Sequence, residues 1–163
     1  MSAASTTEEL LAELGTRGLT LAVAESLTGG LLTAELIRPA GASAVVLGGA
    51  VCYATELKRR LLGVDAELLE RHGPVHPEVA GQMADRVRSA LAVEGRAADI
   101  GLATTGVAGP EPQDGHPAGL AYLGVAIGDR VEAIELRLAG GRDAVRAGVV
   151  ERAVVELAER LPR

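Results

Sequence analysis

Apolar residues in this 163-residue chain follow two patterns, short continuous runs and longer stretches with a helical spacing. Continuous apolar runs of this length are typical of strands that are buried on both faces of a sheet. Three such runs alternate with helical stretches: residues 19–26, 45–53 and 98–106. Strands that alternate with helices are expected to pair parallel, because each helix carries the chain back across the sheet.

The helical stretches place leucine, valine and alanine three and four residues apart, so one side of each predicted helix is apolar. Ser5 or Thr6 is expected to cap the first helix, since each has a glutamate three residues further on. Helices are predicted over residues 5–15, 31–39, 54–64, 65–72, 76–95 and 141–161.

Two further apolar runs, residues 120–128 and 131–140, are joined by a short turn and predict a β-hairpin. The whole order therefore predicts an α/β fold, a three-layer α/β/α sandwich. Its sheet is expected to be mixed and mostly parallel, with about five strands and with helices on both faces. The length is that of one domain, so residues 1–163 are expected to form a single domain.

Composition narrows the classes of function. The net charge of −6 argues against nucleic acid as the main ligand, although a small anion can bind at a locally positive site. The single cysteine, Cys52, excludes an internal disulfide and fits a reducing compartment. The three histidines show no metal-ligand spacing, so no metal is expected. Without a signal-peptide pattern or an apolar run of membrane length, the expected location is the cytoplasm.

Lys58 is the only lysine among the 16 basic residues of the chain. A guanidinium stays protonated, whereas a lysine ammonium can lose its proton when it is buried or close to other cations, and can then act as a base. Arg59 and Arg60 follow directly and could lower the pKa of Lys58 in this way. A solvated surface lysine is the plain alternative, because most lysines are exposed.

Small polar residues and glycines follow the ends of the three predicted parallel strands. In AESLTGG, residues 24–30, a strand runs into Ser26 and a helix then begins, whose N-terminus favours an anion. Thr28 could instead act only as a helix cap. ATTGVAGP, residues 103–110, repeats the plan, and Tyr53 ends the remaining strand.

Ser26, Tyr53 and Thr105 should converge, because ligand sites in open α/β sheets form beyond the carboxyl ends of parallel strands. Lys58 would then be near enough to reach back toward them. A hydroxyl, a phenol and a deprotonatable lysine could serve as nucleophile and base. The alternative is that these residues form turns or pack. The pattern alone indicates a small anionic ligand and a candidate hydrolase, and it matches neither a P-loop nor a dinucleotide fingerprint.

Several long motifs together resemble the C-terminal domain of the competence/damage-inducible protein CinA. They occur in the order AESLTGG, LGGAVCYATELKRRLLGV, GPV, TTGVAGPEPQDGHPAG and GGRDAVR, and span about residues 6–160. Stand-alone members of this family are nicotinamide-nucleotide amidohydrolases. The resemblance therefore implies hydrolysis of the carboxamide of nicotinamide mononucleotide (NMN) to nicotinic acid mononucleotide and ammonia, in pyridine nucleotide recycling. It also implies an α/β/α fold, self-association into a homo-oligomer, and no cofactor.

The resemblance also implies the functional positions. The serine of the family's AES(C/L)TGG motif is Ser26, and the ends of its Y-S-N-E-A-K motif are Tyr53 and Lys58. These three are the expected catalytic residues. The expected substrate-binding residues are Thr28, Gly29, Gly30, Thr105, Gly106, Arg142 and Arg146.

The expected mechanism is that of a serine amidohydrolase. Lys58, aided by Tyr53, takes the proton from Ser26, which attacks the carboxamide carbon. Backbone N–H groups at residues 28–30 or at Gly106 hold the oxyanion. The 5′-phosphate is expected at Arg142, helped by Arg146.

Three alternatives stay open: direct attack by water that Ser26 orients, a non-catalytic nucleotide-binding module in a competence or DNA-damage response, and a phosphotransferase that needs Mg²⁺.

The chain also departs from the family pattern. Leu27 stands where many members have cysteine, and Ala54 and Thr55 replace serine and asparagine. Residues 111–117 replace a glycine-rich loop, so the substrate contacts of this loop cannot be carried over.

Overall fold

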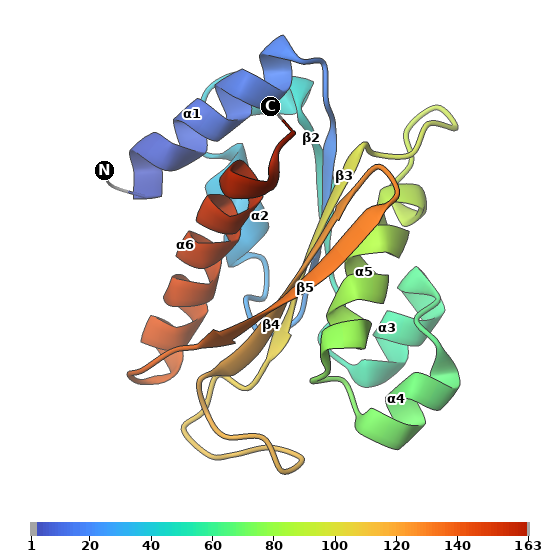
Figure 1. Cartoon of the computed structure of the whole chain (residues 1–163), viewed down its shortest axis with the longest axis vertical. Helices are drawn as coiled ribbons and strands as arrows, with labels where there is room; N and C mark the ends of the chain where they lie inside the picture. Colours follow the sequence, from blue (N-terminus) through green and yellow to red (C-terminus); the bar gives the residue numbers. More distant parts are fainter. Residues whose placement is uncertain (1–2, 163) are drawn as a thin grey trace.

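A five-stranded sheet forms the middle of the computed structural model, which describes residues 3–162 (Figure 1). The strand order is β2-β1-β3-β4-β5; β1 pairs parallel with β2 and β3, and the remaining neighbours pair antiparallel. Four strands therefore point the same way, and the prediction of a mixed, mostly parallel sheet is confirmed. The strands are β1 (Leu21–Glu25), β2 (Val46–Val51), β3 (Ile100–Gly106), β4 (Leu120–Ile127) and β5 (Arg130–Arg137).

Helices cover both faces of the sheet, which confirms the three-layer arrangement (Figure 1). One face carries α1 (Ala3–Thr16), α2 (Leu31–Ile37) and α6 (Arg142–Arg160). The other carries α3 (Thr55–Leu62), α4 (Ala66–His72) and α5 (Pro77–Ala90). A short 3-10 helix, η1 (Ala42–Ala44), was not predicted. Within residues 3–162, none of the helices combines the length and the apolar character that crossing a membrane requires.

Most helix boundaries lie within two residues of the prediction, and two of the differences, at the start of α1 and the end of α5, have a clear local cause. The first helix begins at Ala3, so Ser5 and Thr6 lie within it and the predicted cap is wrong. The alanines at its start are strong helix formers and extend it toward the N-terminus. At the other boundary, α5 ends at Ala90, because residues 93–96 fold back in a tight turn with a bridge between Val93 and Arg96.

The two faces of the sheet pack differently. In β1, Leu21 and Val23 point into the core under α1, α2 and α6, whereas Ala22 and Ala24 face α5. Small residues on that second face let α5 lie directly on the sheet backbone. A Cβ atom at Gly101 of β3 would lie 1.8 Å from the carbonyl oxygen of Ala84 in α5. Glycine is therefore required there by the approach of the helix.

Gly101→Ala should lower the free energy of unfolding by about 3 kcal/mol, because the added methyl group would force α5 away from β3. The matched control is Gly48→Ala in β2, where the nearest atom to a Cβ would be 4.0 Å away, on Leu91. Its effect should stay within about 1 kcal/mol. Urea unfolding of both variants measures the difference, and equal stabilities would contradict the close approach of α5.

Candidate active site

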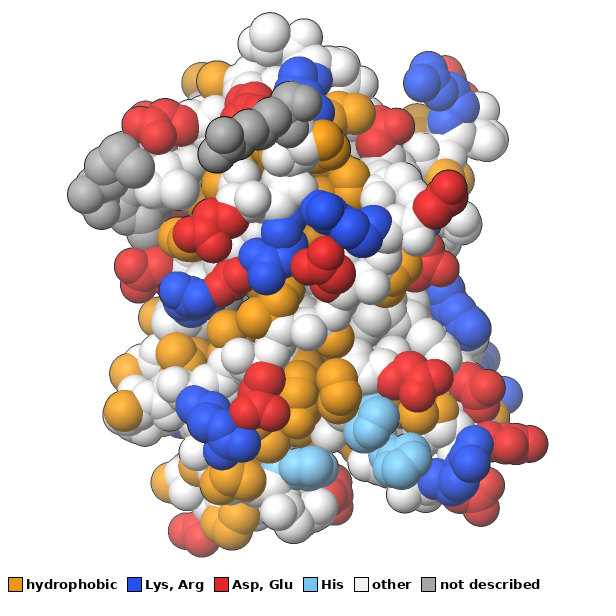
Figure 2. Space-filling view, in the orientation of Figure 1, with side chains coloured by type: hydrophobic (Ala, Val, Ile, Leu, Met, Phe, Trp, Pro, Cys, Tyr) orange, Lys and Arg blue, Asp and Glu red, His pale blue; other side chains and the backbone are white. Residues whose placement is uncertain are grey.

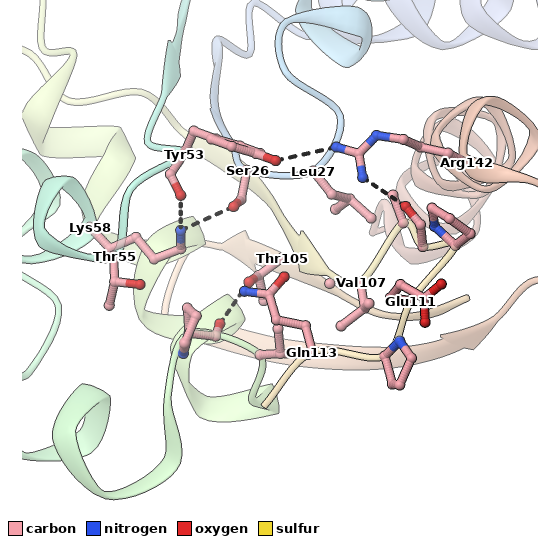
Figure 3. Close-up of a pocket in the computed structure, with 17 residues that line it drawn as sticks. Ser26, Leu27, Tyr53, Thr55, Lys58, Thr105, Val107, Glu111, Gln113 and Arg142 are labelled. Atoms are coloured by element: carbon pink, nitrogen blue, oxygen red, sulfur yellow. Dashed lines mark hydrogen bonds between the residues drawn. The ribbon is translucent and has the colours of Figure 1, made fainter. Parts of the chain in front are cut away.

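A cavity of about 350 Å³ opens beyond the carboxyl ends of β1, β2 and β3, where the sequence analysis expected the site (Figure 3). The structure brings six of the ten predicted site residues to its wall. They are Ser26, Tyr53, Lys58, Thr105, Gly106 and Arg142. The other four, Thr28, Gly29, Gly30 and Arg146, lie outside the wall.

Lys58 points from α3 into this cavity and is only 1% exposed, so the alternative of a solvated surface lysine is excluded. Its Nζ lies 3.0 Å from Oγ of Ser26 (Figure 3). The same nitrogen donates to the main-chain carbonyl oxygens of Cys52, at 2.7 Å, and Tyr53, at 3.4 Å. These contacts aim the amine at the serine hydroxyl.

Burial lowers the pKa of Lys58 from its ordinary value of 10.5 to about 8, because the charged ammonium loses its hydration. The nearby Cys52 thiol has a smaller and opposite effect on this pKa. The neighbouring Arg59 and Arg60 are exposed, so burial is the cause rather than the arginines suggested by the sequence. A substantial fraction of Lys58 is thus neutral near pH 8 and can accept the Ser26 proton.

Tyr53 contacts Lys58 through its main chain and not through its phenol. The phenol oxygen instead accepts a hydrogen bond of 3.2 Å from Arg142 at the start of α6 (Figure 3). Arg142 also donates to the carbonyl oxygen of Gly109, at 2.9 Å. Tyr53 is 62% exposed, so the two side chains form a rim of the cavity rather than its inner end.

Thr105 and Gly106 shape the wall where β3 ends. The hydroxyl of Thr105 donates to the carbonyl oxygen of Pro74 at 2.6 Å, which ties the segment after α4 to the sheet. Gly106 is required by packing, because a Cβ there would lie 2.6 Å from that of Ala121. The structure therefore already gives the Thr105 hydroxyl a protein partner.

The N-terminus of α2 is occupied by the protein's own carboxylate. Oε2 of Glu25 accepts the N–H groups of Gly30 and Leu32, each at 3.0 Å. Oε1 accepts the N–H and the hydroxyl of Thr33, at 2.8 and 2.6 Å. The helix terminus at which the sequence predicted an anionic ligand is thus occupied by Glu25, a residue that the sequence did not single out. A carboxylate at the end of a buried strand was the signal that could have identified it.

Two other anchors hold the turn of residues 26–30. The hydroxyl of Thr28, which is fully buried, lies 2.8 Å from that of Thr104. Arg146 donates to the carbonyl oxygens of Leu27, at 2.9 Å, and Thr28, at 3.3 Å. Arg146 therefore links α6 to the turn, and Arg142 is the residue of this pair that reaches the cavity.

Residues 3–161 match the family model described as the CinA C-terminal domain. The chain belongs to this family. A CinA-like protein of Frankia casuarinae is 48% identical over 134 residues, which are 82% of this chain and 30% of that protein. The chain spans about a third of the length of the curated relatives it matches.

Solved structures of the family match the chain over almost its whole length. The competence damage-inducible protein A (ComA) from Klebsiella pneumoniae is 35% identical with a TM-score of 0.91, covering 99% of this chain and 98% of that chain. The competence or damage-inducible protein from Enterobacter asburiae is 31% identical with a TM-score of 0.93, and 99% of each chain is covered.

Part of the cavity of this CinA domain is lined by residues that were not among the predicted site residues. The wall includes Thr55, Val75 and the loop from Val107 to Gln113. Main-chain hydrogen bonds of 2.8 Å from Val107 to Leu120 and from Gly119 to Val107 hold the base of this loop, and paired bonds between Gln113 and His116 close the turn at its tip. The segment that departs from the family pattern therefore contributes directly to the cavity wall.

Side chains that could bind metal do not gather in the described part of the chain. No group of three or more His, Cys, Asp or Glu residues within residues 3–162 could hold a metal ion. His72 and His76 stack with ring centroids 4.5 Å apart. Figure 2 shows histidines gathered near one end of the viewed face, and acidic and basic side chains interspersed over the rest of it.

The lowered pKa of Lys58 predicts how stability depends on pH. Between about pH 8 and 10.5 the unfolded chain holds a proton on Lys58 that the folded chain has released, so the folded state gains stability as pH rises. A Lys58→Met variant lacks this gain. The stability difference between the two proteins should therefore move in favour of the wild type as pH rises.

Urea unfolding of both proteins from about pH 7 to about pH 10 measures this difference. The other groups that titrate in this range are common to both proteins and largely cancel. Curves that stay parallel would show that Lys58 keeps its ordinary pKa.

Proposed function

We propose that this CinA domain hydrolyses the carboxamide of NMN to nicotinic acid mononucleotide and ammonia. The observation that carries the proposal is the buried Lys58 amine, 3.0 Å from the Ser26 hydroxyl at the wall of a ligand-sized cavity. The family resemblance suggests the substrate. The cavity volume of about 350 Å³ lies within the usual range for small-molecule sites.

In the proposed reaction, neutral Lys58 accepts the Ser26 proton while Oγ attacks the carboxamide carbon. The C–N bond then breaks, and the Lys58 ammonium returns the proton to the departing ammonia. Water hydrolyses the acyl-enzyme, with Lys58 again as base, and releases the acid and free Ser26. Tyr53 takes no proton in this scheme, because its phenol is hydrogen-bonded to Arg142.

The oxyanion donor we propose is the backbone N–H group of Leu27, a residue of the cavity wall. Leu27 directly follows Ser26, and its N–H group makes no main-chain hydrogen bond within residues 3–162. The N–H of Gly29 is used by the carbonyl oxygen of Ser26, and that of Gly30 by Glu25. Thr28 is fully buried outside the cavity wall, so our proposal uses none of the donors expected at residues 28–30 to stabilise the developing charge.

The start of α6 is the proposed site for the 5′-phosphate. Arg142 lies there at the rim of the cavity, and the helix begins after Gly141 without a side-chain cap. An arginine together with an uncapped helix N-terminus suits a phosphate group. The apolar side chains of Val75 and Val107 would contact the pyridine ring between the two ends.

Lys58→Arg and Ser26→Ala should each reduce ammonia release from NMN by about a thousandfold or more, since each removes one member of the proton-transfer pair. Arg60→Lys, the reverse exchange at an exposed position of α3, is the matched control and should keep wild-type activity. The assay contains EDTA, which separates this mechanism from a phosphotransferase that needs Mg²⁺.

Activity of Lys58→Arg close to that of the wild type would contradict the role of the lysine as base. NMN binding by calorimetry without any ammonia release would instead favour the nucleotide-binding module. An acyl-enzyme seen by mass spectrometry after rapid acid quench distinguishes attack by Ser26 from direct attack by water.

The pH dependence of kcat/KM should report the deprotonation of Lys58. Because the neutral amine is the active form, the rate should rise with pH, reach half its maximum near the Lys58 pKa of about 8, and then level off. A steady-state titration of NMN at each pH provides the profile. A rate that falls across this range would be incompatible with a neutral lysine base.

A further inference from the structure

Glu25 is a buried carboxylate that the proposed reaction does not use. Its side chain is 0% exposed, and each of its oxygens accepts two hydrogen bonds from the residues that begin α2. No ion pair to Glu25 occurs among residues 3–162. The carboxylate is stabilised by N–H groups and by the helix dipole instead of a cation.

Burying a charge in this way is a costly solution for a helix of only seven residues. A serine or threonine directly before a helix would satisfy its N–H groups without burying a charge. The position directly before α2 is instead Gly30, which has a φ of 104° and makes no side-chain cap. The capping group comes from Glu25, at the opposite end of the turn.

This arrangement closes the turn that carries Ser26. Glu25 directly precedes Ser26, and its carboxylate binds Gly30, Leu32 and Thr33 where the turn ends. The two ends of residues 26–29 are therefore held together around the serine. Without these bonds the turn would lose the side-chain contacts that tie its beginning to the start of α2, and the anchors at Thr28 and Arg146 would remain.

The main chain of Glu25 reaches the lysine side of the pair. Its carbonyl oxygen accepts the N–H of Cys52 at 2.7 Å. The carbonyl oxygen of Cys52 in turn accepts Nζ of Lys58, also at 2.7 Å. Glu25 is thus hydrogen-bonded both to the turn that carries Ser26 and to the end of β2, where Cys52 binds Lys58.

We propose that Glu25 is a positioning residue that keeps the hydroxyl of Ser26 and the amine of Lys58 within hydrogen-bonding distance. It touches no substrate and acts through these two residues. The catalytic part of its test rests on the proposed function, whereas the structural part does not.

Glu25→Gln is the direct test. A glutamine has only one acceptor oxygen, so its NH₂ group would face two of the donors that bind the second carboxylate oxygen of Glu25 in the wild type. Lys58 is the only lysine, so protein labelled with ¹³C at lysine Cε and carrying no added lysine gives a single signal. In the variant the loosened pair admits water, and the Lys58 pKa should move upward from about 8 toward 10.5.

The kinetic expectation for Glu25→Gln is a fall in kcat of about tenfold to a hundredfold with KM within about twofold, since substrate contacts are untouched. Glu35→Gln is the matched control. Glu35 is a carboxylate on α2 that accepts a hydrogen bond from Thr7 and pairs with Arg38, away from the turn. This control should lose stability while the Lys58 titration and kcat stay unchanged.

Glu25→Gln with an unchanged titration and unchanged kcat would overturn the proposal and leave Glu25 a purely stabilising role. If this variant does not fold, Glu25→Asp, which keeps the charge on a shorter side chain, should move the titration in the same direction by less. An unchanged titration in Glu25→Asp would then overturn it. If the wild type releases no ammonia from NMN, the proposed function fails, and the lysine titration still decides the role of Glu25.

Discussion

The site depends on one contact, the approach of a buried lysine amine to a serine hydroxyl. Removing an ammonium from water is unfavourable, and burial therefore lowers the pKa of Lys58. Two main-chain carbonyl oxygens accept hydrogen bonds from its Nζ, and no carboxylate within residues 3–162 pairs with it. An arginine could not replace Lys58, because a guanidinium cannot release its proton in a protein. The single lysine in a chain rich in arginine therefore occupies a buried position where its ability to release a proton distinguishes it from arginine.

The sheet makes this contact available. β1 lies between β2 and β3 with all three parallel, so Ser26, the carbonyl groups after β2 and Thr105 all emerge at one edge. α3 follows β2 directly and packs on the face that carries α5, which allows Lys58 to reach back across the strand ends. The long α6 closes the opposite side, with Arg142 at the rim and Arg146 bonded to the serine turn.

Periodicity and strand ends were sufficient to predict the layers, the order of the strands and α-helices, and the convergence of Ser26, Tyr53 and Thr105 with Lys58 within reach. These features follow from short-range spacing and from the common direction of parallel strands. The partners of individual polar groups could not be predicted in the same way. The phenol of Tyr53 bonds to a residue 89 positions away and Arg146 to one 119 positions away, so only the folded chain defines these pairs.

Two of the buried ionisable groups at this edge, Glu25 and Lys58, are best understood together. If the Glu25 carboxylate faced Lys58, the ion pair would favour the ammonium and raise its pKa, and the lysine would be a poor base at neutral pH. Instead the carboxylate is fully occupied by four donors at the start of α2. The hydrogen bonds that shape the serine turn thereby also withhold a counter-ion from the lysine. In the proposed mechanism, one side chain would thus serve both the geometry of the nucleophile, Ser26, and the basicity of its partner, Lys58.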